Sequence, residues 1–222
     1  MTERDTFLAE LLRWEGRGDH QSAVCCGCGT SEGVIYRCND CVGPELSCQT
    51  CTVRIHQRNP LHHVEVFSHF IFTFWILMSH IKVWIDNSHF QKVLLKYLGL
   101  CIQLGHKAGE TCCNAAKVIC DDFVVLHVNG IHEVGLDYCD CETSKPQFIQ
   151  LLRYGWFPAS VDRPKTAATF SVLKHFQLLN FESKASLFEF YNTLARLTDN
   201  TGLSPPKVCQ LIPWPLSYLN HM

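Results

Sequence analysis

Closely spaced pairs of cysteines, followed by two histidines, are the residues of this sequence whose types and spacing suit metal chemistry. Residues 21–66 carry three C-x2-C pairs and the histidine pair: Cys25, Cys28, Cys38, Cys41, Cys48, Cys51, His56 and His62. A C-x2-C pair can place both sulfurs on one ion, and zinc takes four sulfur or nitrogen ligands in a tetrahedron. Eight ligands therefore predict two complete Zn2+ sites. A complete site has no open position for water, so the pattern indicates structural zinc and not hydrolysis.

These eight ligands can be divided between two ions either sequentially or by interleaving the pairs. We favour interleaving, because the middle pair lies only a few residues before the third. One ion would then be bound by Cys25, Cys28, Cys48 and Cys51, and the other by Cys38, Cys41, His56 and His62. His63 competes with His62 for the last position. Cys26 and His20 are interpreted as bystanders.

A sparser group of cysteines and histidines follows in the second half of the chain. Cys139 and Cys141 are separated by one residue, which still lets both thiolates reach one ion. His106 and Cys112 are the upstream partners that we favour, and they would complete a third Zn2+ site. Cys113 and Cys120 compete for it, and ordinary buried thiols are the alternative interpretation.

Composition bears on the compartment and on the partners of the chain. The 222 residues include 14 cysteines and carry a formal net charge of −2. Residues 1–20 predict a helix with Phe7, Leu8, Leu11 and Leu12 on one face and contain no apolar core of a signal peptide. We therefore expect an intracellular, reducing compartment, in which paired thiols bind metal rather than form disulfides. No basic stripe supports nucleic-acid binding independently.

The elements that must position the later cysteines are a hairpin and helices. Asn129-Gly130 predicts a hairpin turn between strands at 123–128 and 131–138. Helices are expected from Pro146 to Leu152 and over 166–179. Ser186 and Glu189 predict a capping box at the start of a third helix, which ends before Gly202 and Pro205. The expected fold class is α+β: a small zinc-stapled cross-brace finger at 21–66, followed by a β-hairpin-plus-helices domain at 84–204.

Several runs of residues are similar to known families. YRCNDC, ELSCQTC and the histidine tail resemble a ZZ-type or B-box-type zinc finger and lack the Cys-x-His knuckle of a RING finger. YLGLCIQLGHKAGETC, DDFVVLHVNGIHEVGLDYCDCE, WFPASVDRPKTAATFSVLKHFQLLNFESK and LARLTDNTGLSPPK resemble the CxC type-two cysteine cluster domain associated with KDZ transposases. The resemblance implies a zinc-chelating module ahead of a catalytic domain, and a nuclear location. It implies the same ligands: the eight upstream residues with His106, Cys112, Cys139 and Cys141.

Two segments depart from that family pattern. Residues 67–83 are an apolar insertion, and removing them restores a continuous HHVEVW junction. We favour translation of a retained intron; a membrane-associated helix and a buried helix are the alternatives. Residues 205–222 form a tail where the family pattern continues, and we interpret it as a truncation.

The resulting functional hypothesis is a non-catalytic recognition or targeting module of a KDZ-type transposase that lacks its catalytic domain. Transposon DNA or a peptide is the expected partner, with no small-molecule substrate and no membrane; the oligomeric state is not predicted. No nucleophile–base pair, phosphate-binding loop or paired-carboxylate motif occurs, so no catalytic residue is expected. The alternatives are a peptide-binding or scaffold protein unrelated to DNA, and a degenerate transposon fragment. Scattered cations offer local DNA contacts: Arg54, Arg58, Lys145, Arg153, Arg163 and Lys165.

Overall fold

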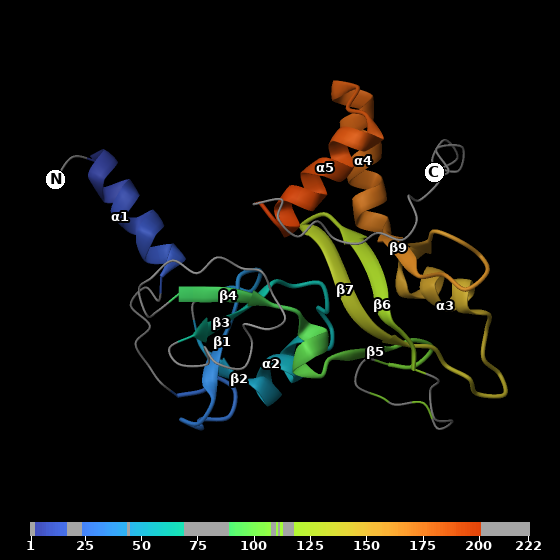
Figure 1. The fold of residues 1–222 in the computed structure, drawn as a ribbon, viewed down its shortest axis with the longest axis horizontal. Coiled ribbons are helices and arrows are strands. Elements are labelled where there is room, and N and C mark those ends of the chain that lie inside the picture. Colours follow the sequence, from blue (N-terminus) through green and yellow to red (C-terminus); the bar gives the residue numbers. More distant parts are fainter. Residues whose placement is uncertain are drawn as a thin grey trace. The chain divides into compact units, whose positions relative to one another are not determined.

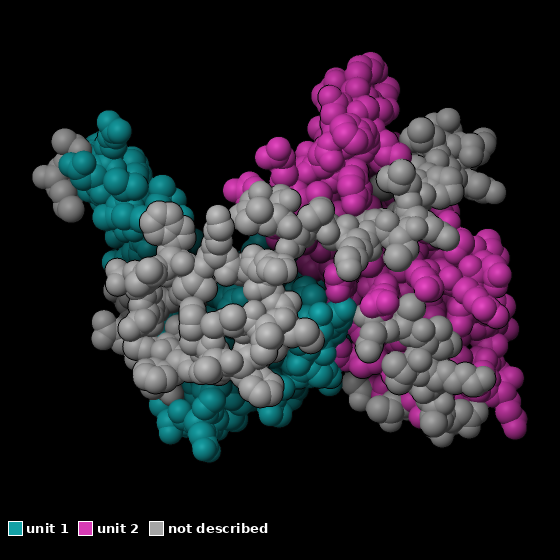
Figure 2. Space-filling view, viewed as in Figure 1, with its two compact units in different colours: residues 1–99 teal, residues 100–222 magenta. Residues whose placement is uncertain are grey.

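A computed structural model describes residues 3–16, 24–43, 45–68, 89–107, 110, 112 and 118–200. The chain divides into two compact units, residues 1–99 and residues 100–222 (Figure 2). Within the described ranges, no helix is both long enough and apolar enough to cross a membrane. The predicted insertion beyond Ser68, the predicted tail, His20 and Cys113 lie outside the described residues, as does the side chain of Cys120.

Unit 1 begins with helix α1 (Glu3–Glu15), inside the segment predicted to be helical. None of its residues is buried, and its four aligned apolar side chains are exposed. Its C-terminal end is held by Arg37, whose guanidinium donates hydrogen bonds to the carbonyl oxygens of Glu15 and Gly16 and pairs with Glu65. Arg37 thereby satisfies carbonyl groups that the end of a helix leaves without a partner.

A small antiparallel sheet forms the body of unit 1. Its strands lie in the order β2 (Ser47–Cys48), β1 (Val34–Cys38), β3 (Val64–Ser68) and β4 (His89–Val93) (Figure 1). Helix α2 (Gln49–His56) follows β2 directly, and a short 3-10 helix, η1 (Leu95–Leu98), follows β4. One buried cluster in this unit comprises only Cys25, Val34, Leu46 and Cys51. Leu61, Val64, Leu95 and Leu98 are also buried in this unit. A unit with so few buried apolar residues needs an additional source of stability.

Unit 2 is built on a mixed five-stranded sheet. Its strands lie in the order β5 (Cys101–Gln103), β7 (Gly130–Asp137), β6 (Val118–His127), β9 (Thr166–Thr169) and β8 (Trp156–Pro158). The β6–β7 and β8–β9 pairs are antiparallel, whereas β5 joins β7 and β9 joins β6 in parallel. The helices are α3 (Gln147–Tyr154), α4 (Phe170–Ser183) and α5 (Leu187–Thr198).

The predicted hairpin is present, but its turn lies one residue earlier than expected. Leu126 pairs with Ile131 and His127 pairs with Gly130, so the loop residues are Val128 and Asn129. Only Gly130 among these has a positive φ, +145°, so the expected Asn-Gly turn is wrong. The observed register places the two apolar side chains opposite each other under the helices, where both are buried. With Asn129-Gly130 as the loop, Leu126 would instead lie opposite Glu133, so direct pairing of two apolar side chains distinguishes the observed register.

Residues 166–169 form strand β9, which corrects the helix expected to begin at Thr166. All four residues are buried, and they lie parallel to Val124–Leu126 of β6. Helix α4 begins only at Phe170, with the Thr169 side chain accepting a hydrogen bond from the Val172 amide. Strand β8 was not expected at all. Both strands are too short to show a periodic pattern, and pairing with the hairpin determines them.

Helices α4 and α5 lie side by side at one end of the β6–β7 hairpin (Figure 1). They bury an apolar core against the hairpin, comprising Val124, Leu126, Ile131, Ala168, Val172, Leu173, Phe176, Phe190 and Leu194. This core contains no cysteine or histidine. Its stability therefore does not depend directly on a metal ion.

The capping box predicted for α5 is confirmed. The Ser186 hydroxyl accepts a hydrogen bond from the Glu189 amide at 3.2 Å, and the Glu189 carboxylate accepts one from the Ser186 amide at 2.8 Å. We predict that Ser186→Ala lowers the stability of α5 by about 1 kcal/mol. Hydrogen exchange of the α5 amides measures this, with Ser183→Ala, a serine outside any N-cap, as the control. Equal protection in the two variants would contradict the prediction.

Candidate metal centres

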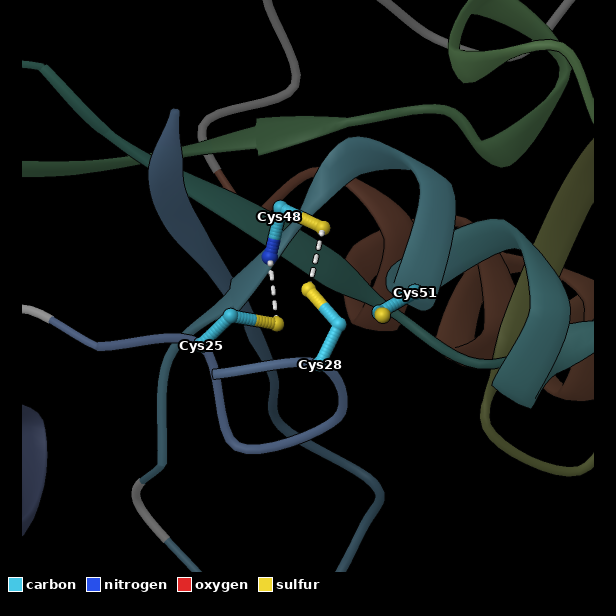
Figure 3. Close-up of side chains that lie close together, drawn as sticks. All are labelled: Cys25, Cys28, Cys48 and Cys51. Carbon is cyan, nitrogen blue, oxygen red and sulfur yellow. Dashed lines mark hydrogen bonds between the residues drawn. The ribbon is translucent and has the colours of Figure 1, made fainter. Parts of the chain in front are cut away.

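The first group of side chains, here called the all-cysteine cluster, comprises Cys25, Cys28, Cys48 and Cys51. Its four sulfurs lie within 4.8 Å of one another. Cys25 and Cys28 come from one turn, Cys48 ends β2, and Cys51 lies in the first turn of α2 (Figure 3). The sulfurs of Cys28 and Cys48 are 3.8 Å apart, as on the edge of a tetrahedral Zn–S4 site, about 3.8 Å for Zn–S bonds of about 2.3 Å.

Backbone amides prepare this cluster for a cation by stabilising a thiolate. The Cys25 sulfur accepts hydrogen bonds from the amides of Cys48, at 3.3 Å, and Gly27, at 3.4 Å. Burial raises the pKa of Cys25, but hydrogen bonds with the amides of Cys48, Gly27 and Cys28 and with the Cys28 side chain outweigh it and lower the pKa to about 6. The thiolate is the form that binds metal.

Two further features bring the turn and α2 together. A Cβ atom on Gly27 would lie 2.9 Å from the Cys51 sulfur, so glycine is required for this close approach. The Arg54 guanidinium, one turn further along α2, donates to the Cys51 sulfur at 3.6 Å. Arg54 therefore offsets negative charge at the cluster, a role different from the DNA contact considered from the sequence.

The second group, here called the mixed cluster, comprises Cys38, Cys41, His56 and His62. Its four ligand atoms also lie within 4.8 Å of one another. Nδ1 of His62 is 3.5 Å from the Cys38 sulfur and 3.3 Å from the Cys41 sulfur, and Nε2 of His56 is 3.7 Å from the Cys41 sulfur. Because Cys51 lies in the first turn of α2 and His56 is its last residue, one helix contributes to both clusters.

Neutral imidazoles with a defined tautomer favour metal binding in the mixed cluster. Nδ1 of His56 lies 2.7 Å from the carbonyl oxygen of Thr52, which can only accept, so this nitrogen carries the proton and Nε2 is left for a metal. Burial lowers the pKa of His56, and burial together with the neighbouring His56 lowers the pKa of His62. Burial, with Cys41 beside it, raises the pKa of Cys38 to about 12.

His63, the alternative to His62, has a different partner. Its ring Nδ1 lies 3.0 Å from a carboxylate oxygen of Asp40, and its backbone amide donates to the same oxygen at 2.6 Å. The Asp40 contact holds His63 away from the mixed cluster and ties the turn carrying Cys41 to the residue after His62. The described structure therefore brings His62, and not His63, to the two sulfurs.

The third group, here called the CxC cluster, comprises His106, Cys112, Cys139 and Cys141, all in unit 2. Its ligand atoms lie within 4.8 Å of one another. The Cys112 sulfur is 3.4 Å from that of Cys141 and 3.9 Å from that of Cys139, and Nε2 of His106 is 3.7 Å from the Cys141 sulfur. Cys139 and Cys141 follow β7, and His106 follows β5, which pairs with β7 in parallel. The sheet thus brings together residues distant in sequence.

Gln150 holds the CxC cluster in position, and sequence reasoning did not identify it. This buried side chain accepts a hydrogen bond from the Cys139 amide at 2.9 Å and donates to the carbonyl oxygens of Cys139 and Lys145. Gly105, at φ +77°, approaches so closely that a Cβ atom would lie 2.6 Å from Cβ of Cys139. A polar residue on an otherwise apolar helix face, four positions after Pro146, was the only sequence signal for Gln150.

All twelve side chains named as ligands from the sequence are therefore gathered into three groups of four, in the interleaved arrangement. Each group offers thiolates, alone or with imidazoles, at separations that suit tetrahedral zinc, and each could bind a metal ion. Cys26 is exposed and belongs to none of these groups.

Comparison with known proteins bears on the second half of the chain. Residues 95–202 match the family model described as CxC2 like cysteine cluster associated with KDZ transposases. The matched range contains the CxC cluster and neither of the other two. No curated protein and no solved structure gave a significant match.

Proposed function

From the match of residues 95–202 to the family of CxC2-like cysteine clusters associated with KDZ transposases, we propose a function for the chain. It is a non-catalytic, zinc-binding module that directs a KDZ-type transposase to its DNA. The observation that carries the proposal is the CxC cluster, whose four ligand atoms converge inside the matched range. Three thiolates and one imidazole fill a tetrahedral zinc ion and leave no position for an attacking water. A zinc ion whose four positions are all filled by protein side chains supports a role in recognition rather than in catalysis.

We further propose that the three clusters hold one Zn2+ ion each. Native mass spectrometry of the intact chain should then find three zinc ions, and Cys141→Ser should reduce the number to two, because a missing thiolate leaves the CxC cluster incomplete. Cys101→Ser, which changes an exposed cysteine outside the clusters, is the matched control and should retain three. Two ions in the unchanged chain, or three in Cys141→Ser, would contradict the assignment.

The net charge of the zinc-loaded chain limits how strongly this module can bind DNA. Counting the zinc-bound thiolates brings the formal charge of the loaded chain to about −5. Long-range attraction to DNA is therefore weak, and contacts must come from local groups of cations. Together with the family association, this favours weak, salt-sensitive contacts with DNA in the nucleus, made by local groups of cations, over tight coating of DNA.

The proposed function is tested with a fluorescein-labelled random-sequence duplex and, in parallel, a peptide array. Binding to the duplex should weaken linearly with the logarithm of salt concentration, because phosphate contacts release counterions. Binding to peptides without binding to the duplex would favour a peptide-binding scaffold and refute the DNA-directed role.

A further inference from the structure

A pocket lies beside the CxC cluster, within unit 2. Its volume is about 390 Å³, large enough for a small ligand or for one unit of a polymer. One wall is formed by Gly105, His106, Cys139 and Cys141, and the other by the following loop and the last turns of α3. The pocket is therefore adjacent to the proposed metal ion but is formed largely by residues that do not bind it.

Cationic and hydroxyl side chains dominate the second wall. Lys145 and Arg153 line the pocket, together with three residues that carry hydroxyl groups, Thr143, Ser144 and Tyr154. Neither cation forms an ion pair with any residue that the structure describes. Two cations that face a pocket without a carboxylate partner are suited to an anionic ligand.

Negative charge near the pocket does not cancel these cations. Asp140 and Glu142 belong to the same loop, but neither lines the pocket. A zinc ion with three thiolates and one imidazole carries a formal charge of about −1. Lys145 and Arg153 therefore leave the lining with an excess of about one positive charge when the metal is bound.

The wall that carries the cations is fixed before any ligand arrives. Gln150 bonds to both Cys139 and the carbonyl oxygen of Lys145, at 2.6 Å for the latter, so α3 and the loop are joined. Arg153 and Tyr154 lie three and four residues after Gln150, which places them on the same helix face. The Tyr154 ring packs edge-on against Trp156, with centroids 4.8 Å apart. A ligand therefore meets a largely preorganised site.

The chemistry of the lining favours phosphate over a peptide side chain. No Val, Leu, Ile or Met contributes to the described lining, so apolar peptide anchors have no matching surface. Phosphate oxygens accept hydrogen bonds from ammonium, guanidinium and hydroxyl groups alike. We propose that this pocket binds a phosphate group through Lys145 and Arg153, and that the phosphate belongs to the DNA backbone. The second part rests on the proposed function.

Fluorescence anisotropy with the labelled duplex tests the site, using the zinc-loaded full chain. The double variant Lys145→Gln/Arg153→Gln should bind the duplex about tenfold more weakly or worse, and its salt dependence should fall by about one unit of slope per lost phosphate contact. The control Lys174→Gln/Arg196→Gln removes the same charge from exposed positions of α4 and α5, outside the pocket. Zinc content of both variants, measured in parallel, establishes that the clusters are intact.

A second titration, with adenosine monophosphate as the probe, separates the site from the proposed function. If the unchanged chain binds the mononucleotide but not the duplex, and the pocket variant loses that binding, the phosphate site stands and the DNA source is refuted. The phosphate site itself is refuted if the pocket variant binds both probes as the unchanged chain does, or if the unchanged chain binds neither. An equal loss in the control variant would also refute it, because the effect would then be one of net charge.

Discussion

Removing zinc with a strong chelator should unfold residues 25–66 while the α4–α5 core of unit 2 stays folded. The buried cluster of Cys25, Val34, Leu46 and Cys51 is small, and two of its four members are proposed ligands. Structural zinc in small fingers contributes about 10–16 kcal/mol of apparent binding free energy, more than the apolar core of so small a unit usually supplies. Loss of the two proposed ions in unit 1 should therefore remove most of the stability of its fold.

Hydrogen-exchange mass spectrometry separates the two units in this experiment. Amides of α2 should lose their protection as zinc is released, whereas those of α4 and α5, whose core contains no cluster residue, should retain it. A metal-sensitive dye reports the released zinc in the same samples. Unchanged protection of α2 after complete zinc release would show that metal does not hold unit 1 together.

Phe176→Ala should have the complementary effect and destabilise unit 2. The Phe176 side chain is 1% exposed, and its ring centroid lies 5.1 Å from that of Phe190. Truncating a buried phenylalanine leaves a cavity and costs about 3–5 kcal/mol. Phe181→Ala, on the same helix but 70% exposed, is the matched control and should change stability by less than about 0.5 kcal/mol.

Exchange of the α5 and β7 amides measures the effect of Phe176→Ala, because both elements pack on this core. Protection in α2 should be the same in both variants, since unit 1 has its own core and its own proposed ions. If the α5 amides were equally protected from exchange in the Phe176→Ala and Phe181→Ala variants, the assignment of Phe176 to a stability-determining core would be wrong.

Spacing explains why the grouping of the metal-binding side chains could be expected from the sequence. The two cysteines of a C-x2-C pair readily bind the same ion. Because zinc takes four ligands, only a few ways of grouping such pairs remain. His106 and Cys112 were harder to assign, because no short spacing links them to Cys139. Parallel pairing of β5 with β7 brings them together, and that contact is not encoded in a local motif.

Strands β8 and β9 show the opposite case, in which local sequence was misleading. Thr166–Thr169 precedes a helical pattern and was assigned to it, yet pairing with β6 makes it a buried strand. The hairpin turn lies one residue earlier than expected, and the observed register pairs Leu126 directly with Ile131, whereas an Asn-Gly loop would pair Leu126 with Glu133. In both places pairing within the sheet overrode a local preference. The interpretation of residues 67–83 stays a prediction.

The sequence by itself determined which side chains are available for metal and which of them come in closely spaced pairs, because ligand type and short spacing act locally. Only the tertiary structure decided what supports these side chains and what lies beside them. It provides the hydrogen bonds between Gln150 and Cys139, the contact of Arg54 with Cys51, and the pocket lined by Lys145 and Arg153. No short sequence motif links the residues that these features bring together. They exist because sheet pairing and helix packing place those backbones together, and such long-range contacts leave little trace in local sequence.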